Sequence, residues 1–104
     1  MHRGKIISPR RLRRIPQSFT WVDHRLVRDH HIDGHTAEAL ALYLFMLTVA
    51  DADGLSWWGD EAVRKRLSLD ENWLRTARAE LQDADLIAYD RPVCQVLDLG
   101  GQSR

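Results

Sequence analysis

The longest apolar segment of the chain, residues 37–50, has the spacing of a helix. Its principal apolar residues recur at three- and four-residue intervals: Leu40, Tyr43, Leu44, Leu47 and Ala50. Thr36 precedes the segment and is a suitable N-cap. The positions between these residues are mostly apolar too, so the helix is hydrophobic almost all round. We therefore expect it to be buried by the rest of the domain or shared with a second copy in a homodimer.

Two more helices are predicted further along the chain, joined by a tight connection at Ser68-Leu69. The first covers residues 61–67 and has Asp60 as its N-cap. The second begins after Asp70, which can cap it, and runs to about Ala84. Its core face follows the i, i+4, i+8 spacing of Trp73 or Leu74, Ala77 and Leu81.

Three short strands are predicted around these helices. Residues 55–58 are apolar and aromatic, and they follow the turn residues 51–54. Residues 86–89 and 93–97 flank the turn residues 90–92, which predicts a β-hairpin. The expected fold class is therefore α+β, mainly helical, with a three-helix core and a small hairpin.

The N-terminal part of the chain has a different pattern. Residues 1–18 are basic, contain Pro9 and Pro16, and show no sustained helical or strand period, which predicts an arm. Residues 19–22 are expected to form a short strand or an extended stretch, and residues 29–35 a loop or a frayed helix end. The predicted organisation is a basic arm over residues 1–18, one domain over 19–99 and a polar tail over 100–104.

The predicted elements follow the order helix, turn, helix, hairpin, and this order is shared with a known protein family. Residues 61–87, EAVRKRLSLDENWLRTARAELQDADLI, resemble bacterial winged helix-turn-helix proteins, including plasmid and phage replication-initiation proteins. The motifs ALALYL and ADG upstream look like the first helix and following turn of these families, so that the resemblance covers roughly residues 19–99. It implies a winged helix that binds double-stranded DNA in replication initiation, transposition or transcriptional regulation, in bacteria or a mobile element.

The resemblance also implies where DNA would bind. The third helix would enter the major groove, and its predicted outer face carries Glu71, Asn72, Arg75, Thr76 and Ala79. Arginine can bond guanine in a bidentate manner and asparagine can bond adenine, so Arg75 and Asn72 are the expected base-contacting residues. Phosphate or minor-groove contacts are expected from three further basic residues: Arg64 and Lys65 on the second helix, and Arg91 at the hairpin turn.

The sequence departs from the family pattern at three places. Asp70 and Glu71 are found where the family often has Ser or Thr followed by basic residues. The two carboxylates can cap the helix. Glu71 can also accept a hydrogen bond from the cytosine amino group. Trp73 replaces a common small Thr, and Asp85 replaces the usual Gly after the helix. A solvated face without DNA remains the alternative for this helix.

The charge of the chain is unevenly distributed. Its formal net charge is zero, yet the first 22 residues hold six basic side chains and no acid. Four of them are the arginines expected to contact DNA if the arm does so: Arg10, Arg11, Arg13 and Arg14. An unstructured, solvated tail is the equal alternative for such an arm.

Other chemistry is sparse in the sequence. The histidines at 24, 30, 31 and 35 and the neighbouring aspartates match no common zinc spacing, so no metal and no cofactor is expected. No nucleophile elbow, phosphate-binding glycine loop or metalloprotease helix is present, which argues against an enzyme. Cys94, the only cysteine, is expected to be a small buried hydrophobe in a reducing, cytoplasmic setting.

A second hypothesis belongs to another functional class. The same fold could hold a protein partner through Trp57, Trp58, Trp73 and an acidic surface, without binding DNA. Trp57 and Trp58 are otherwise expected in the core or at an interface. A continuous basic stripe over the third helix and hairpin would favour DNA, and an acidic surface there would favour the protein partner. No membrane span is expected, because residues 37–50 are shorter than the roughly 20 residues required.

Overall fold

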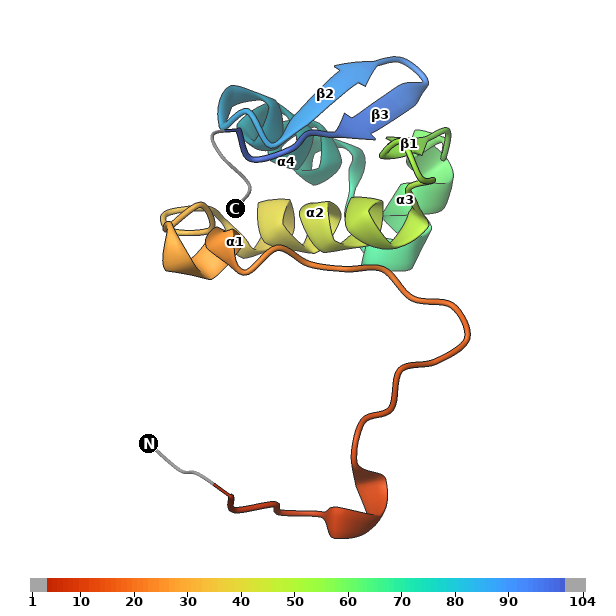
Figure 1. Ribbon diagram of the computed structural model, residues 1–104. Coiled ribbons are helices and arrows are strands. Elements are labelled where there is room, and N and C mark those ends of the chain that lie inside the picture. Colours follow the sequence, from red (N-terminus) through yellow and green to blue (C-terminus); the bar gives the residue numbers. More distant parts are fainter. Residues whose placement is uncertain (1–3, 101–104) are drawn as a thin grey trace.

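Residues 4–100 are described by a computed structural model of the α+β class. In these residues, four α-helices and a three-stranded antiparallel sheet form a body from which the N-terminal arm projects (Figure 1). The arm contains one 3-10 helix, η1 (Pro9–Arg11). The elements of the body are α1 (Arg25–Arg28), α2 (Ala37–Val49), β1 (Leu55–Ser56), α3 (Asp60–Leu67), α4 (Glu71–Asp83), β2 (Ile87–Asp90) and β3 (Val93–Val96). This arrangement is compatible with a winged helix.

Helix α2 forms as the sequence pattern predicts. The Thr36 hydroxyl accepts a hydrogen bond from the Ala39 N–H, which confirms the expected N-cap, and the helix ends one residue before the expected Ala50. One side of α2 is buried against α4 and the sheet through Ala39, Leu42, Tyr43 and Met46. Because the opposite side is apolar as well, Leu44 remains 59% exposed. The helix therefore carries apolar surface that its own domain does not cover.

Helices α3 and α4 lie close to the predicted positions, with one correction at the start of α3. The expected cap Asp60 is the first residue of α3; Gly59 is the N-cap and makes no side-chain bond. The Asp60 side chain is instead hydrogen-bonded to Arg78 on α4. Asp70 caps α4 as predicted, since its carboxylate accepts from the Trp73 N–H at 2.8 Å.

Two residues in left-handed backbone end these helices. Ser68 has φ of 57° after α3, and Asp85 has φ of 62° after α4. Glycine adopts this conformation most easily, and short polar residues are the next best choice. Asp85 therefore takes a conformation that a glycine at this position would adopt more easily.

The sheet has the strand order β1-β3-β2, and its hairpin is the predicted one. Tyr89 pairs with Cys94 across the hairpin, and Ser56 of β1 pairs with Cys94 from the other side. Strand β1 is shorter than expected, because pairing stops after Ser56. Gly54, just before β1, accepts from the Val96 N–H, and a Cβ there would lie 2.8 Å from the Val96 carbonyl oxygen. A side chain at position 54 would therefore separate β1 from β3.

The segment between the arm and α2 follows one of the two predicted alternatives. Residues 19–22 form no strand and lack regular secondary structure, and Thr20 donates its hydroxyl to the Leu47 carbonyl oxygen on α2 at 3.1 Å. The sequence analysis missed the short helix α1, whose Leu26 is buried. Residues 29–35 form turns, as the loop prediction stated. Of the predicted polar tail only Gly100 lies within the described residues.

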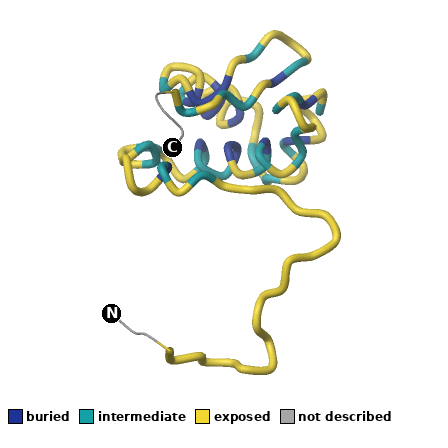
Figure 2. Tube along the Cα trace, viewed as in Figure 1, coloured by how far each residue is buried: buried dark blue, intermediate teal, exposed yellow. Residues whose placement is uncertain are grey.

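Burial is concentrated between α2, α4 and the sheet (Figure 2). Leu42, Leu74, Leu81 and Val63 are the largest fully buried side chains. The arm, by contrast, is exposed along its whole described length. No helix within residues 4–100 is long and apolar enough to cross a membrane.

Candidate nucleic-acid interface

The outer face of α4 carries the five residues that the resemblance assigned to DNA. Glu71, Asn72, Arg75, Thr76 and Ala79 are all exposed, because the buried side of the helix is occupied by Leu74, Ala77, Arg78 and Leu81. The helical period thus separates a core face from a polar face, as expected. This polar face therefore lies open to solvent on the second of two helices joined by a tight turn.

Arg75 on this face is engaged by its own helix. Its Nη2 lies 2.9 Å from Glu71 Oε2 one turn earlier, and the two side chains are 66% and 69% exposed. An exposed i, i+4 pair of this type contributes only about 0.3–0.5 kcal/mol. Arg75 can therefore leave Glu71 for another acceptor at small cost, but Glu71 keeps the local charge close to neutral.

The other residues of the body that were predicted to bind phosphate differ in their exposure and in their bonds to the rest of the protein. Lys65 on α3 is exposed and has no ion pair within the described residues. Arg64 is half-buried, and its Nε donates to the Leu69 carbonyl oxygen at 3.3 Å, so part of this side chain holds the turn between α3 and α4. Arg91 is exposed at the turn between β2 and β3.

Arg78 is a structural residue that the sequence analysis missed. It is 8% exposed, and its Nη2 lies 2.5 Å from Asp60 Oδ1 at the start of α3. Its guanidinium carbon also lies 4.0 Å from the centre of the Tyr89 ring on β2. Arg78 therefore connects α3, α4 and the hairpin, and it fixes the polar face of α4 relative to the hairpin. Its Nε is buried without a hydrogen-bond partner in the described residues.

A second polar cluster joins α4 to the start of α2. Glu80 accepts from the Thr36 N–H, from the Thr36 hydroxyl and, at 2.7 Å, from His35 Nδ1. Burial opposes ionisation of Glu80, but these hydrogen bonds outweigh it and lower the pKa of the carboxyl group. Glu80 is therefore a carboxylate at neutral pH and favours the start of α2 in addition to the Thr36 cap.

The basic groups of the described chain gather in the arm. Lys5 and the four predicted arginines, Arg10, Arg11, Arg13 and Arg14, are exposed and have no ion pair in residues 4–100. The surface around α4, in contrast, mixes Arg75 with the carboxylates of Asp70, Glu71 and Asp83. No continuous basic stripe therefore covers α4 within the described residues. The arm leaves the body on the side of α2 that faces away from α4 and the hairpin (Figure 1).

The histidines do not converge. His35 is bonded to Glu80, and His30 lies 2.9 Å from Asp33 at an exposed site. In the described part of the chain, no group of three or more His, Cys, Asp or Glu side chains is placed to hold a metal ion.

The aromatic residues and the cysteine divide into buried and exposed positions. Trp58 packs edge-on against Phe45 at 5.1 Å, with the Arg66 guanidinium 5.2 Å from its ring, whereas Trp57 and Trp73 are 57% and 50% exposed. Cys94 is buried, and burial raises the pKa of its thiol although Arg78 nearby acts in the opposite direction. Cys94 is therefore a buried hydrophobe, as predicted.

Comparison of the chain with protein-family models, with curated proteins and with solved structures finds no match.

Proposed function

We propose that this chain is a winged helix-turn-helix protein that binds double-stranded DNA, with α4 in the major groove and the β2–β3 hairpin as the wing. The single observation that carries the proposal is the polar face of α4. Five adjacent polar or small side chains are exposed on the second helix of a helix-turn-helix, next to a hairpin that Arg78 holds against the same helix. The major groove is wide enough to admit such a helix.

Base recognition falls to the first two turns of α4. Asn72 and Arg75 project from the exposed face, and these residue types bond adenine and guanine edges in a bidentate manner. Arg75 would exchange its weak pair with Glu71 for a guanine, and Glu71, once released, can accept from a cytosine amino group. Thr76 and Ala79 are small enough to let the helix approach the base edges.

Affinity comes from phosphate contacts. Lys65 on α3 and Arg91 at the β2–β3 turn are exposed cations of the body, and the arm supplies the larger number. The arm can also reach beyond the face on which it starts, because the 15 residues from 4 to 18 span up to about 50 Å when extended. A length of this order can follow a DNA backbone past the body. The processes that fit are replication initiation, transposition and transcriptional regulation.

A binding assay on duplex DNA over a range of salt concentrations tests the proposal. The double variant Arg75→Ala, Lys65→Ala should bind a selected site more weakly than the parent. Arg28→Ala on α1 is the matched control, since it removes an exposed arginine distant in sequence from α3, α4 and the hairpin. Equal binding by the parent and the double variant would overturn the proposed surface.

A protein-interaction module is the second candidate, and a specific observation favours it. Carboxylates outnumber cations around the start of α4, and Trp57 and Trp73 expose half or more of their surface. Exposed aromatic side chains beside acidic groups suit a basic protein partner. This function predicts no duplex binding even at low salt, where phosphate contacts are strongest.

A further inference from the structure

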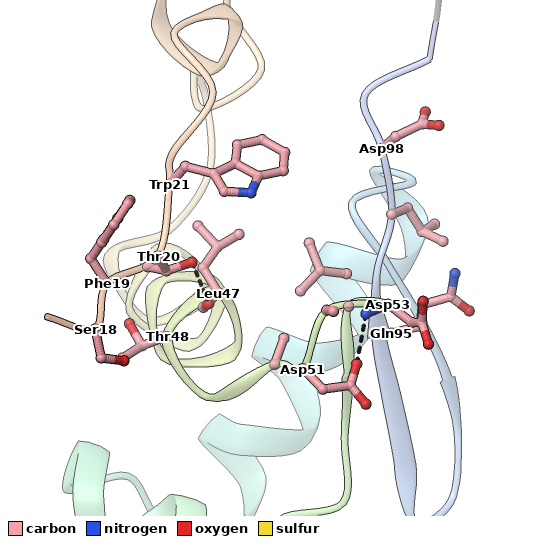
Figure 3. A pocket seen from close by; sticks show the side chains of 15 residues that line it. Ser18, Phe19, Thr20, Trp21, Leu47, Thr48, Asp51, Asp53, Gln95 and Asp98 are labelled. Atoms are coloured by element: carbon pink, nitrogen blue, oxygen red, sulfur yellow. Dashed lines mark hydrogen bonds between the residues drawn. The ribbon is translucent and has the colours of Figure 1, made fainter.

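A groove of about 720 Å³ runs along the body where the arm begins (Figure 3). One wall is formed by the end of α2 together with Ser18, Phe19, Thr20 and Trp21. The other wall is formed by residues 95–98, which are the end of β3 and the two residues that follow it. The turn of residues 50–54 closes one end. None of the residues proposed to contact DNA lines this groove.

The groove has one sign of charge and an apolar lining. Its three charged lining residues, Asp51, Asp53 and Asp98, are exposed carboxylates, and no lysine or arginine lines it. Leu47, Val96 and Trp21 supply apolar surface, and the Trp21 side chain is 75% exposed. Such a surface suits a segment that is both cationic and apolar.

The arm has this chemistry. Between residues 5 and 15 it carries Lys5 and four arginines with no acid. Four aliphatic side chains alternate with them and are exposed: Ile6 at 54%, Ile7 at 93%, Leu12 at 56% and Ile15 at 82%. DNA phosphates would satisfy the arginines but would leave these aliphatic side chains in water. These four side chains are therefore available to pack on an apolar surface.

We infer that the groove binds residues 5–15 of a second copy of this chain, and that two copies exchange their arms reciprocally. The arm cannot fill its own groove in the observed conformation, because residues 18–21, where the arm joins the body, form a groove wall, and the described residues before them run away from the body (Figure 1). In a two-fold dimer each arm root stands beside a groove, so both arms are placed to cross. Pro9 and Pro16 fix φ at two positions of the unbound arm, which lowers the entropy lost on docking.

Arm exchange is compatible with the proposed DNA binding and does not depend on it. Five cations of the arm meet three carboxylates of the groove, so at least two remain for phosphates. The aliphatic positions distinguish the two roles, because they contribute to docking in the groove and not to phosphate contact.

A charge exchange between two variants of the full chain tests the inference. The groove variant carries Asp53→Arg and Asp98→Arg; Asp51 is kept, because its Oδ1 accepts from the Asp53 and Leu55 N–H groups and holds the turn. The arm variant carries Glu in place of Arg10, Arg11, Arg13 and Arg14. Sedimentation or light scattering should give a dimer for the parent, a monomer for each variant alone, and a dimer for their equimolar mixture.

That recovery on mixing is the decisive result, since a variant that failed to fold would not produce it. A monomeric parent, or a mixture that stays monomeric while both variants keep the parent's circular dichroism spectrum, would overturn arm exchange. Leu12→Ser with Ile15→Ser should also give a monomer while retaining every cation of the arm. A dimer in that variant would likewise contradict the inference. Duplex binding measured on the same variant is a separate readout, so the DNA proposal can fail without affecting this one.

Discussion

The polar face of α4 and the N-terminal arm are both proposed to contact DNA, yet they differ in structure and in charge, because the α4 face is close to neutral and the arm is basic. The α4 face is held by a buried core, and its one central arginine is already paired with Glu71. Within residues 4–18 the arm has five cations without an ion pair and no buried residue. Geometry and charge are thus divided in this chain. In the proposed complex with DNA, α4 would supply specificity and the arm would supply affinity.

The largest expected effect comes from removing charge from the arm. Replacing Arg10, Arg11, Arg13 and Arg14 with Gln should weaken duplex binding by several tenfold steps at moderate salt, because each phosphate contact contributes about 0.9 to the slope of log affinity against log salt. The slope should fall by about three to four if all four arginines contact phosphates, and by about two if the groove of a second copy holds three of the arm's cations. The preferred DNA sequence should not change. A titration of labelled duplex at several salt concentrations measures both. An unchanged slope would show that the arm does not contact phosphates.

The next effect concerns the position of α4. Arg78→Ala removes the bond to Asp60 and the contact with Tyr89, and it leaves a space in the core. We expect a loss of about 2–3 kcal/mol in the free energy of unfolding, as for hydrogen bonds to a largely buried charged group. Urea denaturation measures it, and Arg28→Ala, which removes an exposed arginine, should change stability by less than about 0.5 kcal/mol. Equal stability of the two variants would remove the role assigned to Arg78.

A smaller and more selective effect is expected on the α4 face itself. Arg75→Ala should cost about 1–3 kcal/mol of discrimination at one base pair and leave binding to random duplex nearly unchanged. Glu71→Gln should strengthen binding to random duplex, since it removes a negative charge and frees Arg75. Competition between a selected site and random DNA checks both. Loss of binding to all sequences alike in Arg75→Ala would assign Arg75 to phosphate contact.

The secondary structure could be predicted from the sequence, whereas contacts between distant residues could not. Periodicity and capping chemistry placed α2, α4 and the hairpin, because the local signals at Thr36 and Asp70 agree with the buried faces. The pair of Arg75 and Glu71 has the i, i+4 spacing and could have been found in the same way. The contact of Arg78 with Asp60 could not, since it joins residues 18 apart through the packing of two helices.

The position of the arm on the body could not be predicted from the sequence either. Its charge was evident from residues 1–22, but the side of α2 from which it leaves depends on one hydrogen bond, from Thr20 to the Leu47 carbonyl oxygen, and on the packing of α1. The groove beside it combines residues from three distant parts of the chain. No local sequence pattern predicts that these three segments form a groove.

The smallest expected effect is a pH dependence that belongs to the body alone. Because the pKa of Glu80 is lowered in the folded state, its contribution to stability is fully present above the pKa of the unfolded chain and is lost as the pH falls through the folded value. Unfolding measured from neutral to acid pH should therefore show decreasing stability in the acid range, and the decrease should be shallower in Glu80→Gln. The same decrease in both proteins would assign it to other carboxyl groups, among them Asp23, whose bond with Arg25 lowers its pKa to about 2.

Selection of DNA sites from a random duplex pool by the full chain tests the central claim most directly. The account predicts enrichment of a short sequence whose recovery depends on Asn72 and Arg75, while the arm variant with four Gln recovers the same sequence in lower yield. A pool that binds through the arm with no enriched sequence, or one that is not retained even at low salt, would contradict the assignment of α4 as a DNA-recognition helix.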